Sequence, residues 1–477
     1  MKVAVLTLGL MSLAPVLSQA EPVRLAQAGA QAAPDDLPPP RTSARQARPL
    51  PAEPQAAPAA AGGTKADLPP PAPRAPASRP GVKAGVDDLL LEVGVLPDAA
   101  LADSYSTLRA SAYVLWQPIR AWEFRLGARV DGMSQDGGTA NHREFSADLA
   151  DTYVRYRSGD TRLTLGAQTI VWGRVDEIPL ADRVSRVDLT RFVLDDLPDR
   201  RRAQLAARWE QTFGDYKLDA VWLPVFRAAR MPDEESIWSP VNRTTGRIIG
   251  IAPTPALSAF VRSARIDEDE RGSGGGALRL TRTGEPFDYG VTLARTRQSL
   301  PYYRADLLAS RLTAVHPYNT FVGADMEMVR GGQTWRMEVG YTDGVPYTRT
   351  DVSMDKASAL NWVGAVEFFP GGGDTRVNLQ LVANALRTDH AALELDEYYG
   401  ANGEIETRFG NARWRAGMRF AAGFNVNDVY LSPRLAYVGW EPHEIILAAH
   451  YFGGEARSLG GFHEDHSLIT LGLRTRF

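Results

Sequence analysis

The chain has 477 residues, of which 44% are hydrophobic and 23% charged, with a formal net charge of -4 and no cysteine. The nearly balanced charge argues against a nucleic-acid-binding protein. No apolar stretch after the N-terminus approaches the roughly 18 residues of a membrane-spanning helix, so a membrane location would require strands.

The N-terminus has the pattern of a secretory signal. Lys2 is followed by a mainly apolar run over residues 3–17, and Ser18 and Ala20 are small residues at the offsets that a signal peptidase requires. This pattern predicts a signal peptide at 1–20 and argues against a cytosolic location. Export without disulfides is compatible with a chain that has no cysteine.

Residues 21–84 are rich in alanine and proline and almost free of aromatic residues. Such a composition buries too little apolar surface to offset the entropy of ordering, so we expect a disordered periplasmic segment. The sequence DLPPP occurs twice, at 36–40 and 67–71. Residues 31–80 are therefore either a contact site for a periplasmic partner or a spacer with a duplicated low-complexity sequence.

From residue 85 onward, apolar and polar residues alternate with a period of two. In residues 122–131, for example, Trp122, Phe124 and Leu126 alternate with charged residues or glycine. The pattern recurs along the remaining chain in strands long enough to cross a bilayer at a tilt. We therefore predict an all-β fold, a single transmembrane antiparallel β-barrel over 85–477. It should have about 18 strands, with 16 as the alternative and residues 88–95 as the first strand.

The connections between these strands alternate between short and long. Short turns are expected near residues 117–118, 158–160, 213–215, 283–286, 330–332, 370–373 and 441–442. Long loops are expected at about 132–144, 173–201, 226–273, 299–318, 344–358, 387–400 and 454–466. Tight periplasmic turns and long external loops are typical of outer-membrane barrels.

The last strand, residues 467–477, places Ile469, Leu471 and Leu473 on one side and ends on Phe477. An aromatic C-terminal residue resembles the signal by which the barrel assembly machinery of the bacterial outer membrane recognises its substrates. The expected partners are therefore this machinery, outer-membrane lipid and lipopolysaccharide, and no nucleic acid.

The segment from Thr161 to Arg202 contains RLTLGAQTIVWG followed by a series of spaced aspartates. It resembles the DUF1302-type barrels and, more distantly, the alginate-export-type porins, with Gly166, Gln168, Trp172 and Gly173 at the matching positions. The resemblance implies a porin-like conduit formed by a single chain.

The polar rows of the strands predict an arginine-rich lumen. Candidate lumen-facing residues are Arg125, Arg129, Arg155, Arg162, Arg208, Arg336, Arg376, Arg413, Arg415, Arg419, Glu123 and Glu338. An excess of arginine would favour anionic solutes. Alternatively, arginine and carboxylate rows neutralise each other and only stiffen the wall.

The loop after Trp172 is the candidate pore constriction. Apolar residues at helical spacing are surrounded there by charges of both signs, and the candidates are Arg174, Asp176, Glu177, Asp182, Arg183, Arg186, Asp188 and Arg191. Opposite charges across a narrow pore orient polar solutes. The competing interpretation is an external helix that covers the rim.

These observations predict a porin-like channel for polar, possibly anionic, solutes, with no enzymatic activity, catalytic residue, metal or cofactor. The first alternative is an export conduit for an exopolysaccharide or a lipid that works with a periplasmic partner. The second is a rim hydrolase built on His463, Asp465, His466 and Ser467, although chance clustering in an exposed loop is the better explanation of this group.

Overall fold

The computed structural model describes residues 81–97, 101–139, 141–176 and 179–477. The predicted signal peptide (1–20), both DLPPP copies and the proposed partner segment (31–80) lie outside these residues. The first strand begins at Gly81. The predicted boundary at residue 85 is therefore too late, because the alternation starts inside the last part of the segment assigned to disorder.

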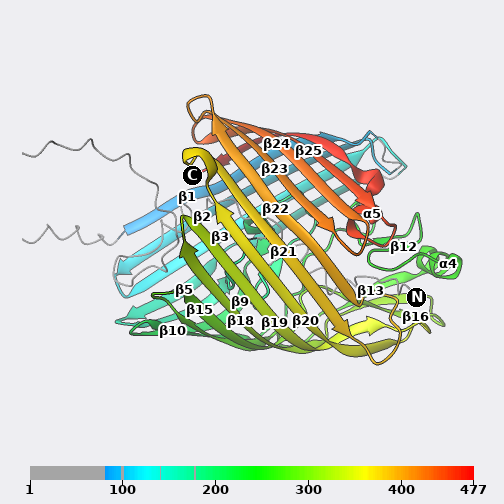
Figure 1. The fold of residues 1–477 in the computed structure, drawn as a ribbon, viewed down its shortest axis with the longest axis horizontal. Coiled ribbons are helices and arrows are strands. Elements are labelled where there is room, and N and C mark those ends of the chain that lie inside the picture. Colours follow the sequence, from blue (N-terminus) through cyan, green and yellow to red (C-terminus); the bar gives the residue numbers. More distant parts are fainter. Residues whose placement is uncertain (1–80, 98–100, 140, 177–178) are drawn as a thin grey trace, which may run out of the picture.

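The strands form one antiparallel sheet that closes on itself (Figure 1). They are β1 (Gly81–Val95), β2 (Ser104–Ile119), β3 (Trp122–Asp136), β4 (His142–Leu149), β5 (Thr152–Ser158), β6 (Thr161–Gln168), β9 (Gln204–Phe213), β10 (Tyr216–Leu223), β14 (Gly275–Arg282), β15 (Asp288–Arg297), β18 (Tyr318–Arg330), β19 (Gln333–Thr348), β20 (Met354–Phe368), β21 (Thr375–Arg387), β22 (Glu397–Phe409), β23 (Trp414–Gly423), β24 (Asp428–Trp440), β25 (His443–Gly454) and β26 (Leu468–Arg476).

The first and last strands close the barrel. β1 pairs with β2 on one side and with β26 on the other, with Asp88 opposite Arg476 and Val95 opposite Ile469. β4 and β5 both pair with β3 and are two parts of one strand, so the barrel has 18 strands. The prediction of about 18 strands is confirmed, and the alternative of 16 is wrong.

The alternation along each strand separates an outer apolar face from a polar interior. On β3, Leu126 is 60% exposed on the outside, whereas Glu123 is 5% exposed on the inside. Outward-facing leucine, valine, tryptophan and tyrosine recur around the barrel. A closed antiparallel sheet satisfies all its backbone groups within hydrocarbon. The protein is therefore a β-barrel of the bacterial outer membrane.

The two ends of the barrel differ as predicted. The end that carries Gly81 and Phe477 has short turns, such as residues 159–160, 214–215, 331–332 and 441–442. One predicted turn was wrong: β2 continues through Gln117 and Pro118, and the chain turns at residues 120–121. The loop predicted at 344–358 is also shorter than expected, because Gly344 forms a bulge at a φ of 82° and β19 continues to Thr348.

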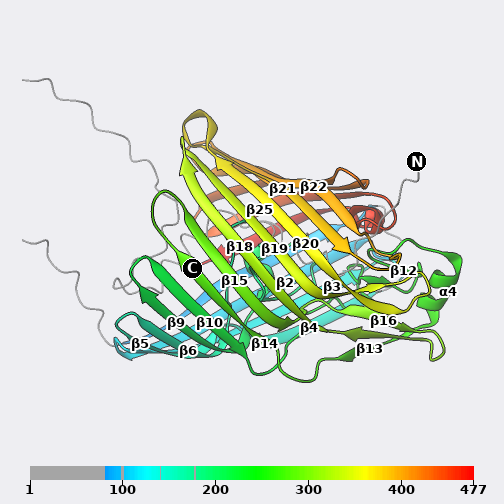
Figure 2. The ribbon, with the colours of Figure 1, turned by 60° about the horizontal axis from the view of Figure 1, so that its bottom comes forward.

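The long connections gather at the other end of the barrel (Figure 2). They contain β11 (Val241–Asn242), β12 (Arg247–Ile248), α4 (Pro255–Ser263), β13 (Arg265–Asp269), β16 (Tyr302–Asp306), β17 (Arg311–Val315), α5 (Leu459–Phe462) and η3 (Glu464–His466). A short η2 (Pro370–Gly372) lies in a turn at the opposite end. No helix among the described residues is long and apolar enough to span a membrane.

The outer apolar face gives a direct stability prediction. We expect Leu126→Arg to lower the free energy of unfolding by about 2–4 kcal/mol, because it places a charge near the middle of the lipid-facing surface. Urea titration of the protein in vesicles measures this loss. The matched control is Glu285→Arg in an exposed turn, which should change stability little. An equal effect of the two variants would contradict the assignment of the outer face.

Candidate functional site

The interior arginines of the wall are paired with carboxylates. All but one of the predicted lumen arginines lie on inward strand rows. Their shortest ion pairs are Arg125–Asp87, Arg129–Asp131, Arg155–Glu123, Arg162–Glu210, Arg208–Asp219, Arg336–Glu327, Arg376–Glu367, Arg415–Glu444 and Arg419–Asp196, with N···O distances from 2.5 to 3.5 Å. The wall therefore has the neutralising arrangement that the sequence left as one of two alternatives.

Arg413 is the exception, and its assignment to the lumen was wrong. It lies in the turn between β22 and β23 and is exposed. The residues before it, Asn411 and Ala412, have φ values of 58° and 61°. These left-handed conformations close the turn, and the strand starts only at Trp414.

The described residues of the connection between β6 and β9, 169–176 and 179–203, lie inside the barrel and are called the inward segment below. It contains β7 (Arg186–Val187), α3 (Leu197–Arg200) and β8 (Arg201–Arg202). Ile170, Trp172 and Val184 are buried in one cluster with residues of the wall. The segment thus occupies the interior, whereas its role as a pore constriction stays a prediction.

The carboxylate of Glu338 on β19 fixes the start of the inward segment. It accepts hydrogen bonds from the backbone N–H groups of Arg174 at 2.5 Å, Val175 at 3.1 Å and Ala181 at 3.0 Å. Gly173 has a φ of 101°, and a Cβ there would lie 2.8 Å from Oε1 of Glu338. A glycine is therefore required where the chain bends over this carboxylate.

A first set of ion pairs joins the segment to β18, β19 and β21. Nε of Arg174 lies 2.6 Å from Oδ1 of Asp325. Oδ2 of Asp176 lies 2.9 Å from Arg336 and 3.1 Å from Arg376. Burial raises the pKa of Asp176, and the two guanidinium groups oppose this effect. The neighbouring candidate Glu177 lies outside the described residues.

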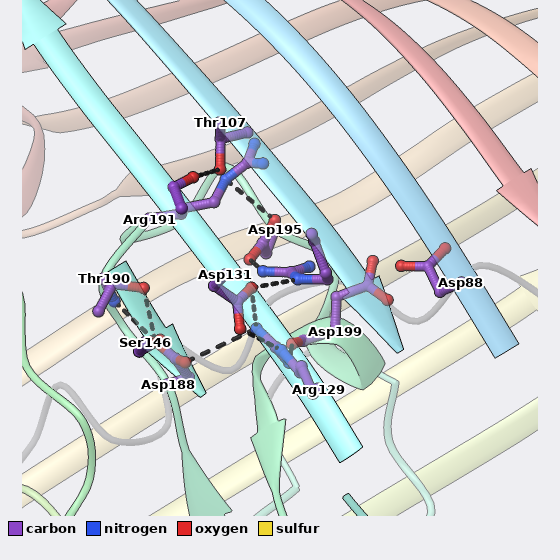
Figure 3. Close-up of polar contacts among 12 residues, drawn as sticks. Asp88, Thr107, Arg129, Asp131, Ser146, Asp188, Thr190, Arg191, Asp195 and Asp199 are labelled. Atoms are coloured by element: carbon purple, nitrogen blue, oxygen red, sulfur yellow. Dashed lines mark hydrogen bonds and ion pairs between the residues drawn. The ribbon is translucent and has the colours of Figure 1, made fainter. Parts of the chain in front are cut away.

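A second set of ion pairs joins the other half of the segment to β2, β23 and β26, and Figure 3 shows two of its carboxylates, Asp195 and Asp199, beside the strands of the wall. Asp195 lies 2.6 Å from Arg109, and Asp196 lies 2.7 Å from Arg419. Asp199 contacts Arg474 at 2.6 Å. The segment is therefore fixed to walls on both sides of the interior. We call these three aspartates the aspartate anchors.

The anchors are buried yet charged. Burial alone would raise the pKa of Asp195, but the guanidinium groups of Arg109 and Arg191 outweigh it and hold the pKa below its usual value. The pKa of Asp199 is likewise lowered, since the nearby Arg474 outweighs the effect of burial. Each anchor therefore keeps its ion pairs at neutral pH.

The remaining constriction candidates have varied surroundings. Asp182 pairs with Arg201 at 3.1 Å, and Arg191 pairs with Glu92 at 2.6 Å. Asp188 accepts a hydrogen bond from the Thr190 hydroxyl at 2.7 Å. Arg186 donates to the backbone carbonyls of Arg227 and Ser185, at 2.5 and 2.8 Å.

A cavity of about 110 Å³ lies between the inward segment and the wall of β15, β18, β19, β20 and β21. Arg183 and Arg297 line it, together with the amides of Gln298, Asn319, Asn361 and Asn384. Among the residues that the structure describes, neither arginine forms an ion pair with a carboxylate. Nη2 of Arg183 lies 3.4 Å from the Thr342 hydroxyl, and its guanidinium stacks over Phe321 at 4.1 Å.

The carboxyl of Glu394 also lines this cavity. It accepts hydrogen bonds from the N–H and hydroxyl of Thr348, at 2.8 and 2.5 Å. Burial raises the pKa of Glu394 to about 7, whereas burial lowers the pKa of Arg183 to about 10. At neutral pH Arg183 is therefore charged while Glu394 is partly neutral. Asp182 also lines the cavity but pairs with Arg201 at 3.1 Å, so the two lining arginines leave the cavity with an excess of positive charge.

The histidine cluster proposed for a rim hydrolase is not an exposed group. His463 and His466 are buried, with Nδ1 atoms 2.9 Å apart, and His463 packs against Phe192 and Trp238. The hydroxyl of Ser467 accepts a hydrogen bond from the N–H of Phe452 at 3.2 Å. These side chains hold the external loop against the inward segment. In the described part of the chain, no group of three or more His, Asp or Glu residues is arranged to hold a metal ion.

Sequence reasoning did not single out Asp199, Arg297 or Glu394. The spacing of the three anchors within the aspartate series after Trp172 was a usable signal for Asp199. Nothing in the local sequence indicates that Arg297 and Glu394 line the same cavity as Arg183, because the three residues come from distant parts of the chain.

No curated protein matches the chain. Among solved structures, OccAB1 of Acinetobacter baumannii is 10% identical with a TM-score of 0.49, over 83% of this chain and 96% of that chain. OccK7 (OpdD) and OpdL of Pseudomonas aeruginosa are 10% and 11% identical, with TM-scores of 0.46 and 0.45, over 83% of this chain and 98% of each of those chains.

The resemblance seen in the segment from Thr161 to Arg202 extends over all of the barrel after β1. The family model described as "Protein of unknown function (DUF1302)" matches residues 96–476. That range runs from the end of β1 to the end of β26. The chain therefore belongs to the DUF1302 family.

Proposed function

We propose that the protein is a porin-like channel whose inward segment selects small polar solutes that carry a negative charge. The carboxylate or phosphate of such a solute would bind in the cavity lined by Arg183 and Arg297. No covalent chemistry is required, because selectivity arises from charge and from the width of the path beside the segment.

The observation that carries this proposal is the difference between the wall and the cavity. Along the wall, guanidinium groups are neutralised by carboxylates a few ångströms away, such as Arg155 by Glu123 at 2.8 Å. Arg183 and Arg297 instead meet hydroxyls, backbone carbonyls and aromatic rings. A guanidinium without a carboxylate partner is available to a solute anion, with which it forms short charge-assisted hydrogen bonds.

The test uses succinate as a probe of the cavity. Added succinate should reduce the KCl current through the purified protein in a planar bilayer. In Arg183→Gln the half-blocking concentration should rise roughly tenfold, the ratio expected for the loss of one hydrogen bond to a charged group. Arg413→Gln, which changes an exposed arginine in a turn, is the matched control. Its half-blocking concentration of succinate should equal that of the wild type. Equal block of all three proteins would contradict the proposal.

A further inference from the structure

The outer surface of the barrel carries a groove on β14, β15 and β18. It has a volume of about 620 Å³ and is lined by Gly275, Gly276, Leu278, Leu293, Arg295 and Tyr318. Leu278 and Leu293 lie opposite each other in the strand register and are 49% and 51% exposed. The floor of the groove is therefore apolar and faces lipid.

Strand register places this groove at the edge of the hydrocarbon layer. Trp222, Gly276, Arg295 and Thr320 are consecutive cross-strand neighbours on β10, β14, β15 and β18. Two residues further from the loops, the corresponding row is Ala220, Leu278, Leu293 and Val322. The first row thus marks the edge of the apolar surface that is nearer to the long loops.

Glycine shapes the groove. Trp222, on the adjacent strand β10, is 59% exposed on one side of Gly276, and Arg295 is exposed on the other. Since Gly276 has no side chain, the surface stays open beside Arg295, and this opening continues onto Leu278 and Leu293.

Arg295 lies on the lipid-facing surface without a carboxylate. Its Nη1 donates to the Thr320 hydroxyl at 2.6 Å, and its guanidinium lies 5.7 Å from the ring centre of Tyr318. In the described part of the chain it forms no ion pair. A cation at the hydrocarbon boundary of the outer leaflet is best neutralised by a phosphate group of the surrounding lipid.

We propose that this groove binds one molecule of lipopolysaccharide through its lipid A part. A lipid A phosphate pairs with Arg295, and an acyl chain lies over Gly276 and along Leu278 and Leu293. The site lies on the opposite face of the wall from the cavity of Arg183, so it does not depend on the proposed channel function. It defines a fixed contact between the barrel and the outer leaflet.

Binding of bisphosphorylated lipid A to the full chain in detergent tests this proposal. Native mass spectrometry should detect one bound molecule on the wild type. The apparent affinity of Arg295→Gln should be roughly tenfold weaker, as expected for one lost charge-assisted contact, and Arg295→Lys should recover part of it. Arg413→Gln, a matched change at the opposite end of the barrel, should bind like the wild type.

Three outcomes would overturn the proposal. The first is unchanged affinity in Arg295→Gln, which would show that this side chain does not hold the lipid. The second is equal binding of dephosphorylated lipid A, which would reduce the groove to an unspecific acyl-chain contact. The third is equal binding of phosphatidylglycerol, which would make the site one for any anionic lipid. Heat-modified migration in gels shows that each variant is folded before binding is measured.

Discussion

The triple variant Asp195→Ala, Asp196→Ala and Asp199→Ala should conduct ions markedly better than the wild type. Removing one partner from a buried ion pair costs about 3–5 kcal/mol, because the other charge stays buried without compensation. Arg109, Arg419 and Arg474 would lose partners that now lie 2.6–2.7 Å away. The inward segment would detach from that wall and leave a wider interior with more positive charge.

Single-channel recording measures both consequences. The triple variant should show larger current steps and a zero-current potential shifted further toward anion selectivity. Asp160→Ala, in an exposed turn outside the lumen, is the control. Current steps of wild-type size in the triple variant would mean that the aspartates do not hold the segment in place.

The anchors also predict how conductance depends on pH. Their pKa values in the folded protein lie below the usual value of 3.8. Their contribution to docking is therefore complete above that value and is lost only as the pH falls through the lowered folded values. In Glu394→Gln, which removes the cavity carboxyl that titrates near pH 7, conductance should stay constant from neutral pH down to about 4 and rise only at lower pH. A rise in conductance between pH 6 and 4 would show that groups other than the aspartate anchors hold the inward segment against the wall.

The second large effect is expected for Glu338→Ala. Its carboxylate accepts three backbone hydrogen bonds from the start of the inward segment. Each buried N–H left without an acceptor costs about 1–3 kcal/mol. We therefore expect the chain around residues 174–181 to leave its position over β19, while the barrel itself stays folded.

Hydrogen exchange followed by mass spectrometry resolves this effect. Amides of residues 174–181 should exchange faster in Glu338→Ala, whereas those of β19 and β20 stay protected. Glu338→Gln, which keeps one acceptor oxygen, should lie between this variant and the wild type, and Glu285→Ala in an exposed turn should have no effect. Unchanged protection of residues 174–181 would show that Glu338 does not position the segment.

The barrel could be predicted because its environment imposes a simple rule on the sequence. Lipid contact requires an apolar residue at every second position, and β3 follows this rule from Trp122 to Val130. The exact ends of strands were harder. A loop was predicted from residue 344, yet β19 accommodates Gly344 and Pro346 and continues to Thr348. The alternation of apolar and polar residues in the sequence includes Arg413, although this residue lies in a turn.

The interior was predicted less completely, since its contacts join residues far apart in the sequence. The charges after Trp172 indicated a segment that meets the lumen, but not which wall residue each would contact. Asp176 pairs with Arg376, 200 positions later. The burial of His463 beside Phe192 likewise depends on two loops meeting inside the barrel. The local sequence around each residue does not indicate such long-range contacts.

The most direct measurement is the current through the purified wild-type chain in a planar bilayer that separates unequal KCl concentrations. A porin-like channel lined by Arg183 and Arg297 should give discrete current steps. Its zero-current potential should have the sign expected when chloride crosses more easily than potassium. A bilayer that shows no steps after insertion of the folded barrel, or a potential of the sign produced by potassium, would contradict the proposed function.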